Sequence, residues 1–196
     1  MGHGLTGVPG VVHSDLVLLN VEPSAPGTSA PGALPRSRQA AALAAFLAVS
    51  FVVSFVGSLP IRANADGWYA TAATAPWTPP GAAVSTIWLL LYTGMAVAAW
   101  LVWRQRLLPR RPAFLAYGGL LVLNLAWPLM FFGMYPLLGS AALWLALGLI
   151  AAHAALAAAT VFRFGPISTA AGLLMLPYLS WLVFSASLNL YAALNN

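Results

Sequence analysis

A run of 51 residues without a charged side chain, from Pro112 to Phe162, constrains the fold of this chain more than any other feature. As a single helix the run would be about 76 Å long, more than twice the roughly 30 Å hydrocarbon thickness of a bilayer. The run must therefore turn once. Its one cluster of helix-breaking residues is Gly133, Pro136 and Gly139, which predicts two membrane spans, at residues 113–132 and 137–162.

The rest of the chain has the same membrane character. Of its 196 residues, 61% are hydrophobic and 6% are charged, and the mean hydropathy is +0.87. Soluble domains carry roughly 25% charged residues. Three further apolar stretches are long enough to cross a bilayer, at residues 40–59, 82–103 and 168–192. The sequence therefore predicts an all-α integral membrane protein that folds as a five-transmembrane-helix bundle.

Two segments lie outside these five spans. Residues 1–38 are rich in proline, glycine and serine and have little apolar periodicity, so we expect a disordered N-terminal tail before a membrane domain at residues 39–196. The segment from Pro60 to Gly81 contains Arg62, Asp66 and several prolines. We expect it to form a long loop, because proline interrupts helices.

The arginines predict how the bundle is oriented. Seven of the eight fall on one side of the predicted spans, and Arg62 falls on the other; the seven are Arg36, Arg38, Arg104, Arg106, Arg110, Arg111 and Arg163. By the positive-inside rule the N-terminus is cytoplasmic, and the C-terminus and the Pro60–Gly81 loop are outside. An alternative is that the first span is a secretory signal cleaved near Ala63-Asn64-Ala65, but its 20 apolar residues exceed the usual length.

Several classes of chemistry are excluded or unsupported by the composition. The chain has no cysteine, which excludes thiol catalysis and thiolate metal sites. It has no His/Asp/Glu cluster with metal-ligand spacing, so we expect no metal and no obligatory cofactor. The arginines flank apolar spans and do not share a face, so we expect no nucleic-acid partner. Among the histidine and acidic side chains, only His153 lies within a predicted span. It could act as an axial ligand or proton carrier, or it could be a neutral imidazole hydrogen-bonded to a neighbouring helix.

Aromatic side chains form stripes at helical spacing. Trp88 and Tyr92 are four residues apart and share one helix face. Two other stripes follow the i, i+3, i+7 pattern: Asn124, Trp127 and Phe131, and Trp181, Ser185 and Leu188. An unpaired amide in hydrocarbon costs several kcal/mol, so Asn124 should point into the bundle. Pro128 should also kink this helix beside a freed carbonyl of Asn124.

Two interpretations of these stripes stay open at this point. They fit an intramembrane pocket for a flat, largely apolar ligand with a polar edge, such as a tetrapyrrole or a sterol. They also fit ordinary core packing. The aromatic residues near predicted span ends, by contrast, are typical of an interfacial belt; these are Trp68, Tyr69, Trp100, Trp103 and Tyr191.

Several motifs in order resemble the TspO/MBR family, which includes the tryptophan-rich sensory proteins, the translocator proteins and the peripheral-type benzodiazepine receptors. The resemblance covers about residues 45–195. It rests on Trp68-Tyr69-Ala70, Trp77-Thr78-Pro79-Pro80, Trp88 with Leu91-Tyr92, Leu123-Asn124-Leu125-Ala126-Trp127-Pro128, Phe131-Phe132-Gly133, and Pro177-Tyr178-Leu179-Ser180-Trp181 with Leu188-Asn189.

The resemblance implies a homodimeric five-helix bundle in a membrane. It also implies a pocket that binds porphyrins such as protoporphyrin IX or haem and, in animal members, cholesterol and synthetic drugs. It implies that Trp77 belongs to a loop covering the pocket. It also implies that Trp88 and Trp181 correspond to tryptophans linked, in some bacterial members, to light-dependent porphyrin breakdown. The implied ligand-binding residues are Trp68, Trp77, Trp88, Tyr92, Asn124, Trp127, Phe131, Trp181, Ser185 and Leu188.

The sequence departs from the family pattern at three places. Thr74-Ala75 replaces a lysine-proline pair before the loop tryptophan, Leu125 stands where tryptophan is common, and no basic residue follows Tyr191 as a sterol motif requires. Our leading hypothesis is a porphyrin-binding receptor or sensor in a bacterial cell membrane. The alternatives are an enzyme that degrades porphyrin in light through Trp88 and Trp181, and a transporter of tetrapyrrole, sterol or lipid.

Overall fold

The computed structural model describes Met1 and residues 34–105 and 109–196. Residues 34–196 form one compact unit, and no strand occurs among the described residues. Five helical segments are long and apolar enough to span a membrane, which confirms the predicted fold class. They are α1 (Arg36–Asn64), α3 (Gly81–Arg104), α4 (Arg111–Pro128) continued by η1 (Leu129–Gly133), α6 (Ser140–Phe164), and α7 (Thr169–Leu174) continued by α8 (Leu176–Asn195).

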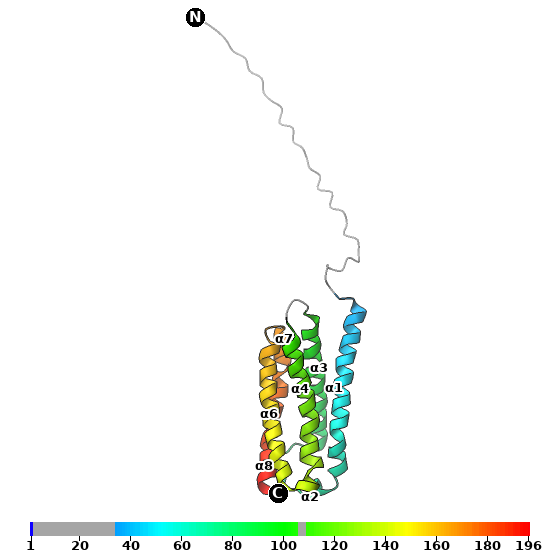
Figure 1. The fold of residues 1–196 in the computed structure, drawn as a ribbon, viewed down its shortest axis with the longest axis vertical. Coiled ribbons are helices and arrows are strands. Elements are labelled where there is room, and N and C mark those ends of the chain that lie inside the picture. Colours follow the sequence, from blue (N-terminus) through cyan, green and yellow to red (C-terminus); the bar gives the residue numbers. More distant parts are fainter. Residues whose placement is uncertain (2–33, 106–108) are drawn as a thin grey trace. The chain divides into compact units, whose positions relative to one another are not determined.

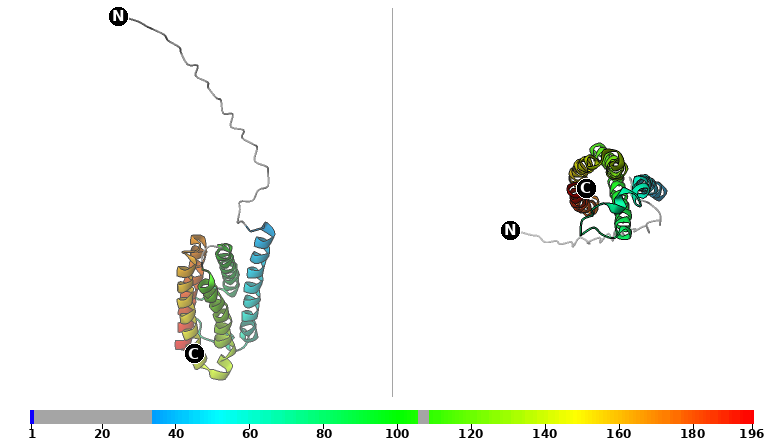
Figure 2. Two further views of the ribbon diagram at one scale, coloured as in Figure 1. Left: turned by 45° about the horizontal axis from the view of Figure 1, so that its top comes forward. Right: turned by 90° about the horizontal axis from the view of Figure 1, so that it is seen from below.

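The spans alternate in direction and close into a bundle (Figure 1). Helix α1 packs against α3 and α4, α4 packs against α6, and α6 packs against α8. Helix α3 completes the bundle by packing mainly against α7 and less extensively against α8. Figure 2 shows this arrangement along the helix axes. The limited α3–α8 contact matters because these two helices carry Trp88 and Trp181.

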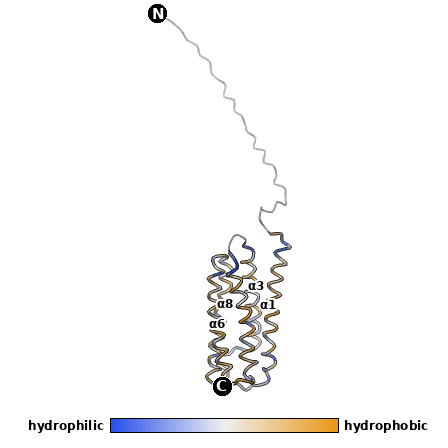
Figure 3. Tube along the Cα trace, viewed as in Figure 1, coloured by the Kyte–Doolittle hydropathy of each residue, from blue (hydrophilic) through white to orange (hydrophobic). Residues whose placement is uncertain are grey.

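The two ends of the bundle differ in chemistry. At the arginine end, defined here by Arg36, Arg38, Arg104, Arg111 and Arg163, lie the start of α1, the end of α3, the start of α4 and the end of α6. At the opposite loop end lie the short helices α2 (Trp68–Thr71) and α5 (Tyr135–Leu138) and the end of α8. Figure 3 shows hydrophobic residues along the helices and hydrophilic residues mainly at their ends.

The first span is longer than the sequence predicted. Helix α1 begins at Arg36, inside the predicted tail, and continues to Asn64, past Pro60, where the prediction placed a loop. The remainder of that loop also contains a helical turn, α2. A proline removes only one backbone donor, and spanning helices tolerate it when neighbouring groups compensate. The Asn64 side chain also stabilises the last turn of α1, because its Nδ2 donates to the Pro60 carbonyl at 2.9 Å. The predicted disorder of residues 2–33 lies outside the described residues.

Prolines also modify the third and fifth spans. After Pro128 the third span continues as the π-helical segment η1 and ends at Gly133, so the expected disturbance is a π-turn. The fifth span, predicted to be continuous over residues 168–192, is interrupted at Met175, because Pro177 restricts the preceding residue and starts a new helix. The turn predicted at Gly133, Pro136 and Gly139 is confirmed: α5 and Gly139, with a φ of +57°, connect η1 to α6.

Candidate functional site

Trp88 of α3 and Trp181 of α8 meet at the sparse contact between these helices. Their ring centroids are 6.4 Å apart and their planes are perpendicular, at 90°. The Tyr92 ring lies 5.8 Å from Trp88, one helical turn along α3, and the Phe184 ring lies 5.2 Å from Trp181 on α8. We call Trp88, Tyr92, Trp181 and Phe184 the α3–α8 cluster. It confirms that the stripes on these two helices face each other.

The indole nitrogen of Trp181 is an exception among the buried polar atoms. Among the described residues, Trp181 Nε1 is the only buried side-chain nitrogen or oxygen that has no hydrogen-bond partner. A buried donor left without an acceptor costs about 1–3 kcal/mol, and native proteins satisfy nearly all such groups. The α3–α8 cluster therefore holds a buried donor that has no acceptor among the described residues. Ser185, one helical turn further along α8, is also buried.

A buried polar network lies next to this cluster and joins three helices. The Asn124 side-chain Nδ2 donates to the Leu120 carbonyl at 3.0 Å and to the Tyr178 hydroxyl at 2.8 Å. The Tyr178 hydroxyl is also 2.6 Å from His153 Nε2. Asn124 is 4% exposed, and His153 and Tyr178 are each 1% exposed. The Tyr178 ring contacts the Trp88 ring edge to face at 6.4 Å, so the network supports one wall of the cluster.

This network decides between the interpretations of two predicted residues. Asn124 points inward, as expected, but both hydrogens of its amide are used within the protein. His153 of α6 hydrogen-bonds to α8, which matches the second of the two readings of this residue. The sequence analysis missed the central position of Tyr178. Its spacing of three and seven residues before Trp181 and Ser185 places it on the same α8 stripe and would have revealed it.

The freed carbonyl of Asn124 does not line a pocket. A Cβ built at Gly57 of α1 would lie 3.3 Å from this carbonyl oxygen and 3.6 Å from Pro128 Cγ. The carbonyl therefore faces the backbone of α1, which approaches closely because residue 57 has no side chain. The carbonyl expected to be freed beside Pro128 is therefore covered by α1.

A second aromatic cluster lies toward the loop end. Trp127 stacks on Phe131 at 5.3 Å, and its Nε1 donates to Asn189 Oδ1 at 2.9 Å. Asn189 in turn donates to the Leu143 carbonyl at 2.9 Å. Trp68 of α2 stacks on Tyr135 at 3.8 Å and donates to the Phe132 carbonyl at 3.0 Å. Trp127 packs against both hydrophobic clusters of the bundle, so it connects this group to the residues around Trp88.

The segment between α2 and α3 is tied to α8. The Ala73 amide donates to Asn196 Oδ1 at 2.8 Å, and Asn196 Nδ2 donates to the Ala73 carbonyl at 3.1 Å. Trp77 Nε1 donates to Ser187 Oγ at 3.3 Å, and its ring lies 5.6 Å from Tyr191. In α2, burial raises the pKa of the Tyr69 hydroxyl above its ordinary value. The loop tryptophan thus contacts the same helix that carries Trp181.

Comparison with known proteins agrees with this arrangement. The TspO/MBR family matches residues 45–194, nearly the whole bundle. The chain belongs to the TspO/MBR family. Among its relatives, the Translocator protein of Ovis aries is 36% identical over 138 residues, which cover 69% of this chain and 78% of that protein.

Prokaryotic relatives match over similar lengths. The Tryptophan-rich protein TspO of Archaeoglobus fulgidus is 29% identical over 148 residues, covering 75% of this chain and 91% of that protein. The Tryptophan-rich sensory protein of Cereibacter sphaeroides is 32% identical over 127 residues, covering 65% of this chain and 75% of that protein. These matches establish a multi-pass membrane protein of this family.

In this TspO/MBR member most of the predicted site residues belong to two aromatic clusters, and Asn124 belongs to the buried polar network beside them. The α3–α8 cluster brings together Trp88, Tyr92 and Trp181, with Ser185 nearby on α8. Trp68, Trp127 and Phe131 belong to the cluster toward the loop end, and Trp77 lies in the loop, half exposed. Leu188 is partly buried on α8. In the part of the chain that the structure describes, no three His, Cys, Asp or Glu side chains gather as a metal site.

Proposed function

We propose that this protein is a membrane receptor or sensor that binds a porphyrin, of the protoporphyrin IX or haem type, at the α3–α8 cluster. The observation that supports it most is the buried indole N–H of Trp181, which lacks an acceptor beside the perpendicular ring of Trp88. A porphyrin supplies a flat apolar face for the rings and carboxylate oxygens as acceptors. The family resemblance points to the same ligand class, and a sterol-like molecule is the alternative ligand that it suggests.

The proposal is tested by titrating the purified protein with protoporphyrin IX in the dark and following tryptophan fluorescence. We expect saturable quenching in the wild type. Trp181→Phe removes the indole donor and keeps an aromatic ring, so affinity should fall about tenfold, the value of one hydrogen bond to a charged group. Trp88→Phe should weaken binding less, because a smaller ring still stacks.

Trp144→Phe is the matched control. Trp144 lies on α6, is 48% exposed, and belongs to neither aromatic cluster. Its replacement should leave the dissociation constant unchanged. Saturable quenching that is identical in Trp181→Phe and Trp144→Phe would place the ligand elsewhere and refute the proposed site.

A second candidate function is light-dependent porphyrin degradation. A continuous set of ring contacts favours it: Trp181 to Trp88 at 6.4 Å and Trp88 to Tyr178 at 6.4 Å. Such closely spaced oxidisable rings suit donation of an electron to a photoexcited ligand, which is reduced as the ring is oxidised. Illumination of the bound protein should then bleach the porphyrin, and the Trp88→Phe/Trp181→Phe variant should bleach it more slowly at equal occupancy. Equal bleaching rates at equal occupancy would exclude this function.

We also propose the orientation that the arginines predict, with the arginine end in the cytoplasm. The absence of cysteine makes single-cysteine labelling unambiguous. Thr74→Cys in the loop and Gln105→Cys at the end of α3 are both at exposed positions. An impermeant maleimide should label Thr74→Cys in intact cells and Gln105→Cys only after permeabilisation. The reverse labelling pattern would contradict the proposed orientation.

Homodimer formation stays a prediction, to be tested by cross-linking in membranes.

A further inference from the structure

A groove lies at the arginine end, far along the bundle from the loop segment. It is formed by the start of α4, the end of α6 and the turn that leads into α7, and has a volume of about 280 Å³. Its lining includes Pro112, Ala113, Phe162, Arg163, Pro166 and Ile167. Pockets for drug-sized ligands start at roughly 300 Å³, so this groove suits a smaller group than a macrocycle.

The walls of the groove are apolar and conformationally restricted. Pro112 and Pro166 have fixed φ angles and no backbone N–H, so the lining presents few donors besides the Arg163 guanidinium. The turn is also tightly packed: a Cβ built at Gly172 of α7 would lie 2.9 Å from Gly165 Cα. The groove is therefore held in shape before any ligand binds.

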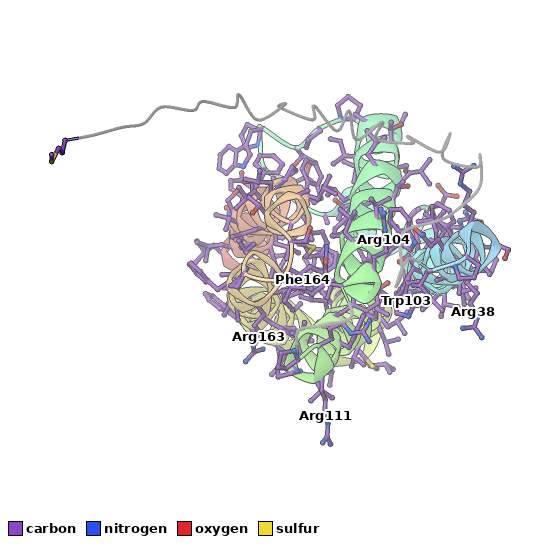
Figure 4. All side chains as sticks on the ribbon, turned by 90° about the horizontal axis from the view of Figure 1, so that it is seen from above. Arg38, Trp103, Arg104, Arg111, Arg163 and Phe164 are labelled. Carbon is purple, nitrogen blue, oxygen red and sulfur yellow. The ribbon has the colours of Figure 1, made fainter. Side chains whose placement is uncertain are left out.

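The charge around the groove is positive and lacks a counter-charge among the described residues. Figure 4 shows Arg111 and Arg163 projecting from neighbouring helices on one side of the arginine end, apart from Arg38 and Arg104. Asp66 is the only acidic residue in the part of the chain that the structure describes, and it follows α1 at the loop end. Two other arginines already have partners: Arg110 donates to the Trp103 carbonyl, and Arg104 lies 4.6 Å from the Trp100 ring centre.

An apolar surface continues from the groove toward the middle of the membrane. Phe162, next to Arg163 in the sequence, is 78% exposed, and Leu115, one turn into α4, is 68% exposed. Arginines at the ends of spanning helices lie at the level of the lipid headgroups. The site therefore combines a cation at headgroup depth, a small apolar cleft and exposed apolar side chains below it.

We propose that this groove binds the phosphodiester headgroup of an anionic phospholipid, with Arg163 on the phosphate, Arg111 adding positive charge nearby, and the acyl chains along Phe162 and Leu115. Guanidinium groups bind phosphate oxygens in a bidentate manner, and basic pockets between membrane helices favour anionic headgroups. A zwitterionic lipid brings its own cation close to these arginines and is disfavoured. A soluble phosphate lacks the acyl chains that Phe162 and Leu115 would cover.

The test uses the full chain in a neutral detergent and measures the rise in unfolding temperature as lipid is added. Phosphatidylglycerol should stabilise the protein in a saturable manner, whereas phosphatidylcholine and inorganic phosphate should not. Arg163→Gln should weaken the apparent affinity for phosphatidylglycerol about tenfold, because a hydrogen bond to a charged group is lost. Arg163 is exposed, so the variant should unfold at the wild-type temperature without lipid.

Arg104→Gln is the matched control at the same end of the bundle. It removes one positive charge but lies over Trp100 and does not line the groove. Phosphatidylglycerol affinity should be unchanged in this variant. An equal loss in Arg104→Gln and Arg163→Gln would reduce the effect to net charge and overturn the site. Stabilisation by phosphatidylcholine or by inorganic phosphate equal to that by phosphatidylglycerol would overturn the assignment to an anionic lipid.

Discussion

Tyr178 is the residue on which three spans depend. Its hydroxyl contacts Asn124 of α4 and His153 of α6, and its ring contacts Trp88 of α3. In the hydrocarbon region no water can replace a missing partner, so polar groups must be satisfied within the protein. One phenol therefore satisfies two buried polar side chains and fixes the ring beside the α3–α8 cluster.

Replacing Tyr178 with phenylalanine should destabilise the bundle. The change deletes the hydroxyl and leaves His153 Nε2 and one Asn124 hydrogen without their partner, at a cost of about 1–3 kcal/mol. The unfolding temperature in detergent should fall by several degrees. Tyr191→Phe is the control, because its ring contacts Trp77 but its hydroxyl forms no hydrogen bond among the described residues. Equal unfolding temperatures in the two variants would contradict this role.

The sequence predicted which polar side chains face the interior of the bundle better than it predicted their hydrogen-bond partners. That Asn124 faces the interior follows from the cost of burying an amide in lipid. Its partner Tyr178 is 54 residues away, and the choice of that partner depends on how α4 and α8 are rotated against each other. For the same reason, the split between Trp88 with Trp181 and Trp127 with Phe131 could not be predicted from spacing along single helices.

At the scale of elements, a close approach of the α1 backbone to α4 depends on Gly57. Pro128 lacks the N–H that would bond to the Asn124 carbonyl, and the backbone of α1 covers this oxygen. The close contact is possible because glycine has no Cβ, as in many helix pairs within membranes.

Gly57→Ala should therefore weaken the bundle. The new Cβ would lie 3.3 Å from the Asn124 oxygen, a backbone atom that cannot move without shifting the helix. We expect a lower unfolding temperature and weaker porphyrin binding, because α4 carries Trp127 and Asn124. In Gly118→Ala, on α4, the added Cβ meets nothing within 4 Å, and this variant should be neutral or more stable, since alanine favours helix. Equal effects of the two substitutions would refute the close-contact explanation.

The element boundaries show what local sequence can and cannot predict. The turn between the third and fourth spans was predictable, because three breakers coincide with the only point at which the uncharged run can fold back. Pro60 looked like an equally good boundary, yet α1 continues to Asn64. Contacts around this turn are not visible in the local sequence pattern: the Asn64 side chain donates to the Pro60 carbonyl, and η1 packs beside Pro60, where a Cβ built at Gly133 would lie 3.5 Å from Pro60 Cβ.

At the scale of the whole molecule, the small number of charged residues determines the fold and limits which side chains are available to bind the proposed ligand. Five spans follow from apolar length, and all the described arginines except Arg62 lie at one end of the bundle, where the groove between α4 and α6 lies. Within the spans, the proposed binding depends on indole rings, amides and hydroxyls. Which of these donors remains unsatisfied is a property of the packed bundle, and Trp181 Nε1 could not be identified from sequence.

The most direct test of the central claim is a structure of the protein with protoporphyrin IX bound. We expect the macrocycle between α3 and α8, in contact with the Trp88 ring, with a ligand oxygen about 3 Å from Trp181 Nε1. A macrocycle bound on another surface, with Trp181 Nε1 still lacking an acceptor, would contradict it.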